Sequence, residues 1–173
     1  MKWQPLIIAP LAALVSPAHA TDYLTIPQAQ ALMLPGQALK PSPISLTDDQ
    51  RDALLDRSGV HEAFDPSRIW RAADGSWFVV DEVVGKHEKI TYAVTLDPHG
   101  AVKDVEILQY HETYGYEVRN PDWRKQFVGK TAHDPLKLGD DIHNVSGATL
   151  SCKHVTQGVK RVLALYDLVL AKR

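Results

Sequence analysis

Residues 90–107 read ITYAVTLDPHGAVKDVEI, and this stretch sets the class of fold. Its apolar residues alternate with the others on both sides of DPHG, which is the period of a half-buried strand. Asp97, Pro98 and Gly100 belong to the residue types that favour a turn. The stretch therefore predicts an antiparallel hairpin. Short apolar runs between Gly75 and Gly85 predict further strands before it.

The C-terminal part of the chain changes to a helical period. Apolar residues fall at spacings of three and four, which predicts one apolar helical face over about 18 residues: Val155, Val159, Val162, Tyr166 and Val169. Residues 111–150 are richer in polar and turn residues, so we expect functional loops there.

Two shorter helices are predicted before the strands. Thr25 is suited to cap a helix that stops before Pro35-Gly36, and Thr47 and Gln50 form the capping box of a second helix. We therefore expect an α+β fold. In it, the long C-terminal helix and a helical N-terminal segment pack on a mainly antiparallel sheet.

Residues 1–20 have the features of a secretory signal peptide. Lys2 precedes an apolar run that is too short to span a bilayer, and Ala18-His19-Ala20 fits the small residues of a cleavage site. We expect an exported protein in the periplasm or outside the cell, with an uncleaved anchor as the alternative. Residues 21–66 are then a helical N-terminal segment with a linker, and residues 67–173 are the functional domain.

The composition argues against several classes of protein. Nineteen Lys and Arg against 21 Asp and Glu give a net charge of −2. This balance argues against a nucleic-acid-binding protein, which needs an excess of basic residues. The single Cys152 forms no internal disulfide, and we expect a buried thiol there rather than a reactive one. The eight His residues match no zinc-ligand spacing, so no metal site is expected.

The stretch SGATLSCKH at residues 146–154 carries the chemistry. It opens into the C-terminal helix, and the N–H groups at a helix start form an anion site. Acidic side chains usually occupy the first turn, but here Lys153 and His154 stand near it. Ser146, Thr149 and Ser151 add hydroxyl groups. The stretch predicts either a phosphate site or an ordinary helix start after a tight turn.

SGATLS resembles the flavinylation motif of the FMN-binding domain family. That family includes flavin subunits of the sodium-pumping NADH:quinone reductase and of Rnf-type complexes. A second segment, HETYGY at residues 111–116, resembles the Glu-Thr-Pro-Gly loop of the family. The residues that follow it, Trp123, Phe127 and Gly129-Lys130, match the family's Trp and Phe-x-Gly-Lys. A weaker third match runs from Tyr23 to Gly36.

The resemblance implies that Thr149 carries FMN through a phosphoester bond. It also implies a set of cofactor-binding residues in two groups. Around the phosphate these are Ser146, Gly147, Ala148, Ser151 and Lys153. Against the flavin ring they are Glu112, Thr113, Tyr114 and Gly115. Two positions depart from the family pattern: His143 stands where an acidic residue is usual, and Tyr114 replaces the Pro of the loop.

We therefore expect an exported flavoprotein that shuttles electrons between a membrane reductase and an extracytoplasmic acceptor. A covalent bond would keep FMN on a carrier that has no access to the cytoplasmic pool. The family implies a separate flavin transferase that uses FAD and Mg²⁺, and the carrier itself needs no catalytic residue. A peripheral association with the membrane fits this role. The alternatives are a non-redox module that binds a phosphate or acidic ligand reversibly at residues 146–154, and a flavin enzyme acting on a small substrate.

Overall fold

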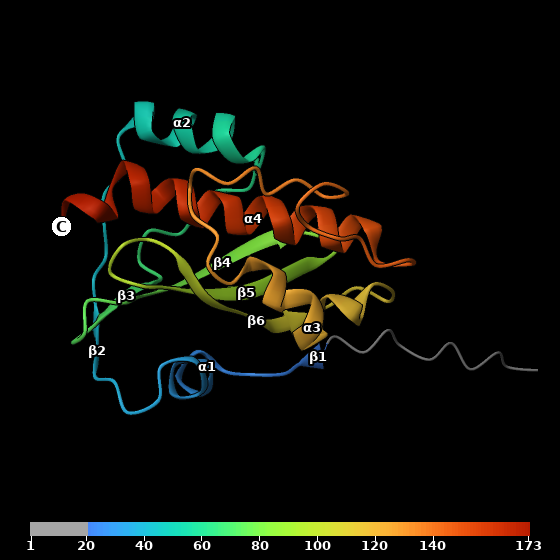
Figure 1. Cartoon of the computed structure of the whole chain (residues 1–173), viewed down its shortest axis with the longest axis horizontal. Helices are drawn as coiled ribbons and strands as arrows, with labels where there is room; N and C mark the ends of the chain where they lie inside the picture. The colour runs from blue at the N-terminus through green and yellow to red at the C-terminus, as the bar shows by residue number, and fades with distance from the viewer. Residues whose placement is uncertain (1–20) are drawn as a thin grey trace, which may run out of the picture.

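The fold is built on one six-stranded antiparallel sheet, with the strand order β1-β6-β5-β4-β3-β2 (Figure 1). The computed structural model describes residues 21–173, so the expected signal peptide lies outside the described residues. The strands are β1 (Thr21–Asp22), β2 (Leu39–Pro41), β3 (Ile69–Ala72), β4 (Trp77–Val84), β5 (Lys89–Leu96) and β6 (Val102–Tyr110).

The predicted hairpin supplies two of the four inner strands of this sheet. Strands β5 and β6 pair with Val94 opposite Val105 and Leu96 opposite Val102. The side chain of Asp97 closes the turn by accepting hydrogen bonds from the N–H groups of His99 and Ala101, at 2.8 and 2.9 Å. The turn chemistry that the sequence indicates therefore holds the register of the two strands.

The helices begin and end close to the predicted signals. They are α1 (Ile26–Met33), α2 (Asp48–Ser58), α3 (Pro121–Arg124) and α4 (Thr149–Leu168), with the 3₁₀ turns η1 (Tyr116–Arg119), η2 (Lys125–Phe127) and η3 (Leu170–Lys172). Thr25 and Thr47 form complete capping boxes at α1 and α2, and Gly59 ends α2. The α+β class is confirmed. The region 111–150, read from sequence as loops, also contains η1, α3 and η2.

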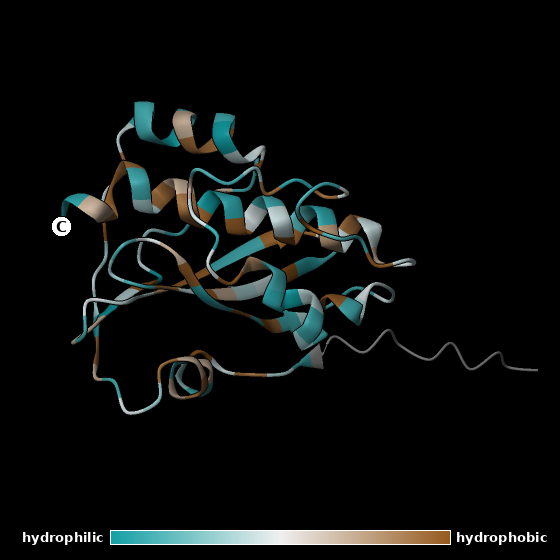
Figure 2. Ribbon diagram, in the orientation of Figure 1, coloured by the Kyte–Doolittle hydropathy of each residue, from teal (hydrophilic) through white to brown (hydrophobic). Residues whose placement is uncertain are grey.

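Both faces of the sheet are covered, as Figures 1 and 2 show. Helix α4, with α2 over it, packs on the face that carries Val79, Tyr92 and Val94. Helix α1 packs on the opposite face, against Phe78 and Ala93. The predicted alternation along β5 is present. The strand is nevertheless buried on both faces, because helix α1 of the N-terminal segment covers the second face.

A buried ion pair fixes α4 to the sheet. The guanidinium group of Arg161 donates to both carboxylate oxygens of Asp81, at 2.9 and 2.7 Å, and Tyr92 donates to the same carboxylate at 2.6 Å. All three side chains are almost inaccessible to solvent. Such a bidentate pair holds one geometry, which fixes the position of the helix along the strands.

The N-terminal segment 21–66 is part of the same sheet. Strand β1 forms one edge beside β6, and β2 forms the other edge beside β3. The predicted boundary at residue 67 falls just before β3. Within residues 21–173, no helix combines the length and the apolar character that a membrane crossing needs.

Candidate functional site

The candidate site lies where the chain turns into α4. The N–H of Ala148 donates to the C=O of Val145 at 3.0 Å, and Gly147 has a φ of 86°. This left-handed conformation favours glycine, so the Ser-Gly-Ala sequence suits the turn. The helix begins at the next residue, Thr149.

The start of α4 is open. Its N-cap residue Ala148 has no side-chain cap, and the first turn holds no acidic residue. The first helical hydrogen bond runs from Cys152 N–H to Ala148 C=O. The N–H groups of residues 149–151 therefore have no acceptor within residues 21–173, and they form the anion site that the sequence predicts.

Thr149 is exposed at this helix start. Its Oγ1 accepts a hydrogen bond from Asn144 Nδ2 at 2.9 Å. Because the amide NH₂ donates here, the proton of the Thr149 hydroxyl stays free. Asn144 is not among the residues predicted for the site, although an Asn five residues before the acceptor hydroxyl is a local signal.

The second sequence motif packs against the first. Tyr110, at the end of β6, donates through its hydroxyl to the C=O of Tyr114 at 2.5 Å, and the same oxygen lies 2.8 Å from Ser151 Oγ. Burial raises the pKa of Tyr110 to about 12, so the hydroxyl is protonated at neutral pH. Residues 111–116 are thereby held against the first turn of α4.

Gly115 permits this close approach. Its φ is 94°, and a Cβ there would lie 2.6 Å from both Ser151 Oγ and Tyr110 Oη. A side chain at this position would force these two hydroxyl groups or the loop to shift. The two sequence motifs, residues 111–116 and residues 146–154, are therefore in direct contact in the folded protein.

Glu112 organises a neighbouring turn. Its Oε1 accepts hydrogen bonds from the backbone N–H groups of Lys86, His87 and Glu88 in the turn between β4 and β5. Burial opposes ionisation, but these three N–H groups lower the pKa of the carboxyl below its ordinary value. Glu112 is therefore a charged anchor for residues 86–88.

The predicted site residues divide by exposure. Ser146, Gly147, Thr149 and Lys153 are exposed around the helix start, as are Thr113 and Tyr114 on the loop. Ala148 and Ser151 are buried, at 2% and 4% exposure. Ser151 faces Tyr110 rather than open solvent. The structure thus brings the two motifs together. The hydroxyl groups of Ser146 and Thr149 are on exposed residues, whereas Ser151 is buried.

The rest of the second signature supports the loop before Thr149. Trp123 Nε1 donates to the C=O of His143 at 2.8 Å, and Gln126 accepts from the N–H of His143 at 2.7 Å. Lys130 pairs with Asp141 at 2.9 Å. The backbone of His143 therefore holds the loop, while its side chain is exposed.

Two cavities flank this region. The first, here called the lysine pocket, has a volume of about 430 Å³ and is lined by residues 59–62 and 83–86 together with Lys153, His154 and Gln157. His154 Nδ1 donates to the C=O of Gly85 at 2.6 Å, which ties α4 to the end of β4. The lysine pocket thus follows the first turn of α4 along the helix.

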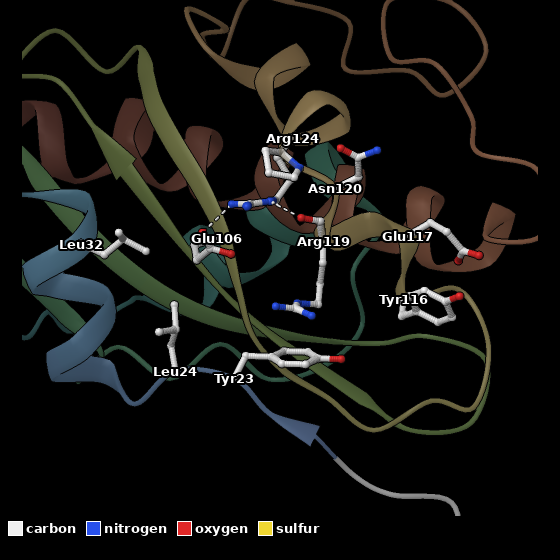
Figure 3. Close-up of a pocket in the computed structure, with 10 residues that line it drawn as sticks. Tyr23, Leu24, Leu32, Glu106, Tyr116, Glu117, Arg119, Asn120 and Arg124 are labelled. Atoms are coloured by element: carbon white, nitrogen blue, oxygen red, sulfur yellow. Dashed lines mark hydrogen bonds and ion pairs between the residues drawn. The ribbon is translucent and has the colours of Figure 1, made fainter.

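The second, here called the arginine pocket, has a volume of about 610 Å³ and lies between η1 and the segment after β1 (Figure 3). Its Arg119 guanidinium stacks 3.4 Å from the centre of the Tyr23 ring. Arg124 pairs with Glu106 at 2.7 Å. The cations of the arginine pocket are therefore already engaged.

The cysteine in the first turn of α4 is buried, and the described residues hold no cluster of metal ligands. Within residues 21–173, no group of three or more His, Cys, Asp or Glu side chains is placed to hold a metal ion. Cys152 is fully buried, and burial raises the pKa of its thiol. The expectation of a buried Cys152 is confirmed.

The arrangement fits a flavin mononucleotide. The free N–H groups and Lys153 suit a phosphate, and the exposed Tyr114 offers an aromatic surface. The family model of the FMN-binding domain matches residues 85–164, which include both motifs. No curated protein matches the chain. We conclude that residues 85–164 belong to the FMN-binding domain family and that the chain is a flavin-binding protein.

Proposed function

We propose that this protein carries FMN on Thr149 through a phosphoester bond and transfers electrons between a membrane reductase and an extracytoplasmic acceptor. One observation carries the proposal. The exposed Thr149 hydroxyl stands at a helix start whose N–H groups have no acceptor in the described part of the chain. A modifiable oxygen beside N–H groups that can bind a phosphate supports attachment at this residue.

Attachment requires a second protein. Thr149 is a weak nucleophile, and its hydrogen-bond partner Asn144 is an amide, which does not act as a base. A flavin transferase would supply the base, with FAD and Mg²⁺. Thr149 Oγ then forms a bond to the FMN phosphorus, the bond to the AMP phosphate breaks, and the hydroxyl proton passes to the base. The exposure of Thr149 leaves room for this reaction.

The first turn of α4 would hold the phosphate. The helix dipole and the free N–H groups favour a negative charge there, and Lys153 one turn later adds a positive charge. Without an anion, this lysine near a helix start is electrostatically unfavourable. A bound phosphate removes that conflict, which supports the assignment of the residues around Thr149.

Apolar surface near the helix start would cover part of the flavin ring. Tyr114 is 81% exposed and Leu150 is 44% exposed, so both side chains are free to contact a ring. The ring supplies the redox chemistry when bound, and these side chains would shield and orient it. Tyr114, where the family has proline, adds an aromatic face that can stack on the ring.

Export and the electron partners complete the proposal. The signal-like residues 1–20 support export, which would carry the mature protein beyond the cytoplasmic FMN pool. A covalent bond prevents the loss of the cofactor by dilution there. The electron donor would be a membrane-bound reductase, with which the protein would associate peripherally.

Mass spectrometry after co-expression with a flavin transferase tests the proposal. The wild-type protein should gain the mass of one FMN minus one water, and Thr149→Ala should gain none. Thr47→Ala is a matched control, because Thr47 also stands at a helix start but lacks the Ser-Gly-Ala turn. It should gain one FMN.

Two outcomes would contradict the proposal. Modification of Thr149→Ala would place the cofactor on another residue. Unmodified wild-type protein that binds phosphate or free FMN reversibly would favour the non-redox binding module. Acid precipitation separates these cases, because only a covalent flavin remains yellow in the precipitate.

A further inference from the structure

We propose that the arginine pocket is a second binding site, separate from the start of α4, and that it takes a small organic acid with one carboxylate group on an aliphatic or aromatic body. The guanidinium group of Arg119 would bind the carboxylate, and Leu24 and Leu32 would contact the body. This inference goes beyond the proposed function. The arginine pocket shares no lining residue with the lysine pocket or with the Ser-Gly-Ala-Thr turn.

Arg119 is the arginine that the fold leaves without a hydrogen-bond acceptor. The sequence contains eight arginines, all of them within residues 21–173. The guanidinium group of Arg119 donates no hydrogen bond and forms no ion pair within these residues, and the residue is exposed. Its N–H groups are therefore free to bind an anion. The other seven donate to a carboxylate or a carbonyl group: Arg51, Arg57, Arg68, Arg71, Arg124, Arg161 and Arg173.

The ring of Tyr23 holds this guanidinium group in one orientation. Cζ of Arg119 lies 3.4 Å from the centre of the ring. The stacking engages one flat face of the cation and leaves the N–H groups at its edge free. The backbone of Arg119 is also fixed, because its C=O accepts a hydrogen bond from Arg124 Nε at 3.0 Å. A side chain that is held in advance loses less freedom when it binds a ligand, which favours binding.

The neighbouring carboxylate of Glu106 does not compete for Arg119. Its Oε1 accepts a hydrogen bond from the N–H of Ile107 at 3.1 Å, and its Oε2 pairs with Arg124 at 2.7 Å. Both oxygens are therefore engaged, and the charge of Glu106 is compensated. The free cation of the arginine pocket is thus available to a carboxylate from outside.

Glu117 limits the charge of the ligand. This second acidic residue of the lining has its Oε2 buried without a hydrogen-bond partner in the described residues. In Figure 3 it lies on the opposite side of Arg119 from Leu24 and Leu32. Two arginines and two glutamates leave the lining with no net charge, so an anion with two charges such as phosphate would be repelled. One carboxylate group fits this balance better.

Apolar surface stands beside the free guanidinium group. Leu32 of α1 is 57% exposed, and residues 23–39, which lead from β1 through α1, contain no charged side chain. Leu24 and Leu32 lie on the side of the pocket toward which the guanidinium group of Arg119 points (Figure 3). The cavity of about 610 Å³ is of a size usual for small ligands. An apolar body would cover this surface and remove it from water, which favours a larger acid over acetate.

Calorimetric titration of the whole protein with hexanoate tests the site, and hexanol and hexylamine are matched probes without the carboxylate. Hexanoate should bind more tightly than either. Arg119→Gln should weaken the binding of hexanoate about tenfold, the loss of a hydrogen bond between charged groups, and leave that of hexanol unchanged. Arg57→Gln is the control, because Arg57 is an exposed arginine that does not line the arginine pocket. It should bind hexanoate like the wild type.

Two substitutions at Tyr23 test whether its ring positions Arg119. Tyr23→Phe keeps the ring and should keep the wild-type affinity for hexanoate. Tyr23→Leu removes the ring and should weaken binding about threefold, the equivalent of one exposed cation–π contact. The NMR signal of Arg119 Nε–H gives a second measurement. It should shift when hexanoate is added to the wild type or to Tyr23→Phe, and the same spectra show that each variant is folded.

Three results would overturn this inference. The first is hexanoate that binds no more tightly than hexanol, and the second is equal binding of hexanoate to the wild type and to Arg119→Gln. The third is an Arg119 signal that shifts with inorganic phosphate but not with hexanoate. Thr149→Ala should bind hexanoate like the wild type, because Thr149 lies outside the arginine pocket. Failure of the flavin proposal would therefore leave this inference standing, and the reverse also holds.

Discussion

The hydroxyl oxygens of Tyr110 and Ser151 lie 2.8 Å apart, and this contact joins the end of β6 to the first turn of α4. Tyr110 also donates to the C=O of Tyr114, so Ser151 is the donor in the contact between the two side chains. The loop of residues 111–116 and the helix that begins at Thr149 are therefore positioned by one phenol group.

Replacing Tyr110 should separate these elements. Tyr110→Phe leaves the buried Ser151 hydroxyl without its partner, so we expect a loss of about 1–3 kcal/mol in the free energy of unfolding. Urea denaturation measures this loss. Tyr114→Phe is the matched control, because this exposed hydroxyl makes no hydrogen bond within residues 21–173, and its effect should stay within about 0.5 kcal/mol. Equal stability of the two variants would contradict the structural role of Tyr110.

Gly115 should tolerate no side chain. In Gly115→Ala, the new Cβ would meet both Tyr110 Oη and Ser151 Oγ, in a left-handed backbone conformation. Gly129 has a similar φ of 81° but open space around its Cβ position, so Gly129→Ala isolates the cost of the conformation alone. We expect Gly115→Ala to be less stable than Gly129→Ala by about 1–3 kcal/mol in thermal or urea unfolding. The same loss in both variants would show that the close contact has no energetic consequence.

Asn144 should assist the modification of Thr149. The hydrogen bond from Asn144 Nδ2 to Thr149 Oγ1 stabilises negative charge that develops on the oxygen during attachment. Asn144→Ala should slow attachment of FMN by the transferase roughly three- to tenfold, the equivalent of one ordinary hydrogen bond. A time course by mass spectrometry gives the rate.

The neighbouring His143 provides the control for Asn144. Its exposed side chain forms no hydrogen bond or ion pair within residues 21–173, so His143→Ala should keep the wild-type rate. A similar slowing in both variants would point to a general change in the loop instead of a specific contact.

Glu112 should make stability depend on pH. Its pKa in the folded protein lies below the ordinary value of 4.5, because the N–H groups of residues 86–88 outweigh burial. A carboxyl with a lowered pKa stabilises the fold above its unfolded pKa, and this contribution is lost as the pH falls through the folded pKa. The difference in unfolding free energy between wild type and Glu112→Gln should be constant near neutral pH and shrink below about pH 4.5. A difference that stays constant from pH 7 to pH 3 would contradict this role.

Local signals in the sequence determined much of this protein. The alternation along residues 90–107 gave the central hairpin, and the capping residues Thr25 and Thr47 located the first two helices. The Ser-Gly-Ala-Thr turn and the acid-free start of α4 were also readable. Each of these features depends on a few neighbouring residues and their backbone preferences, so it can be predicted from the sequence.

The pairs of residues that face one another across the fold depend on how its elements pack. Ser151 meets Tyr110 across 41 positions, and Arg161 meets Asp81 across 80. The same packing assigns Glu112 to the turn of residues 86–88 and gathers Lys86 and Lys153 around one pocket. Such contacts depend on how strands and helices stack, because burial and shape select among many partners of similar chemistry. No single stretch of this sequence carries that information.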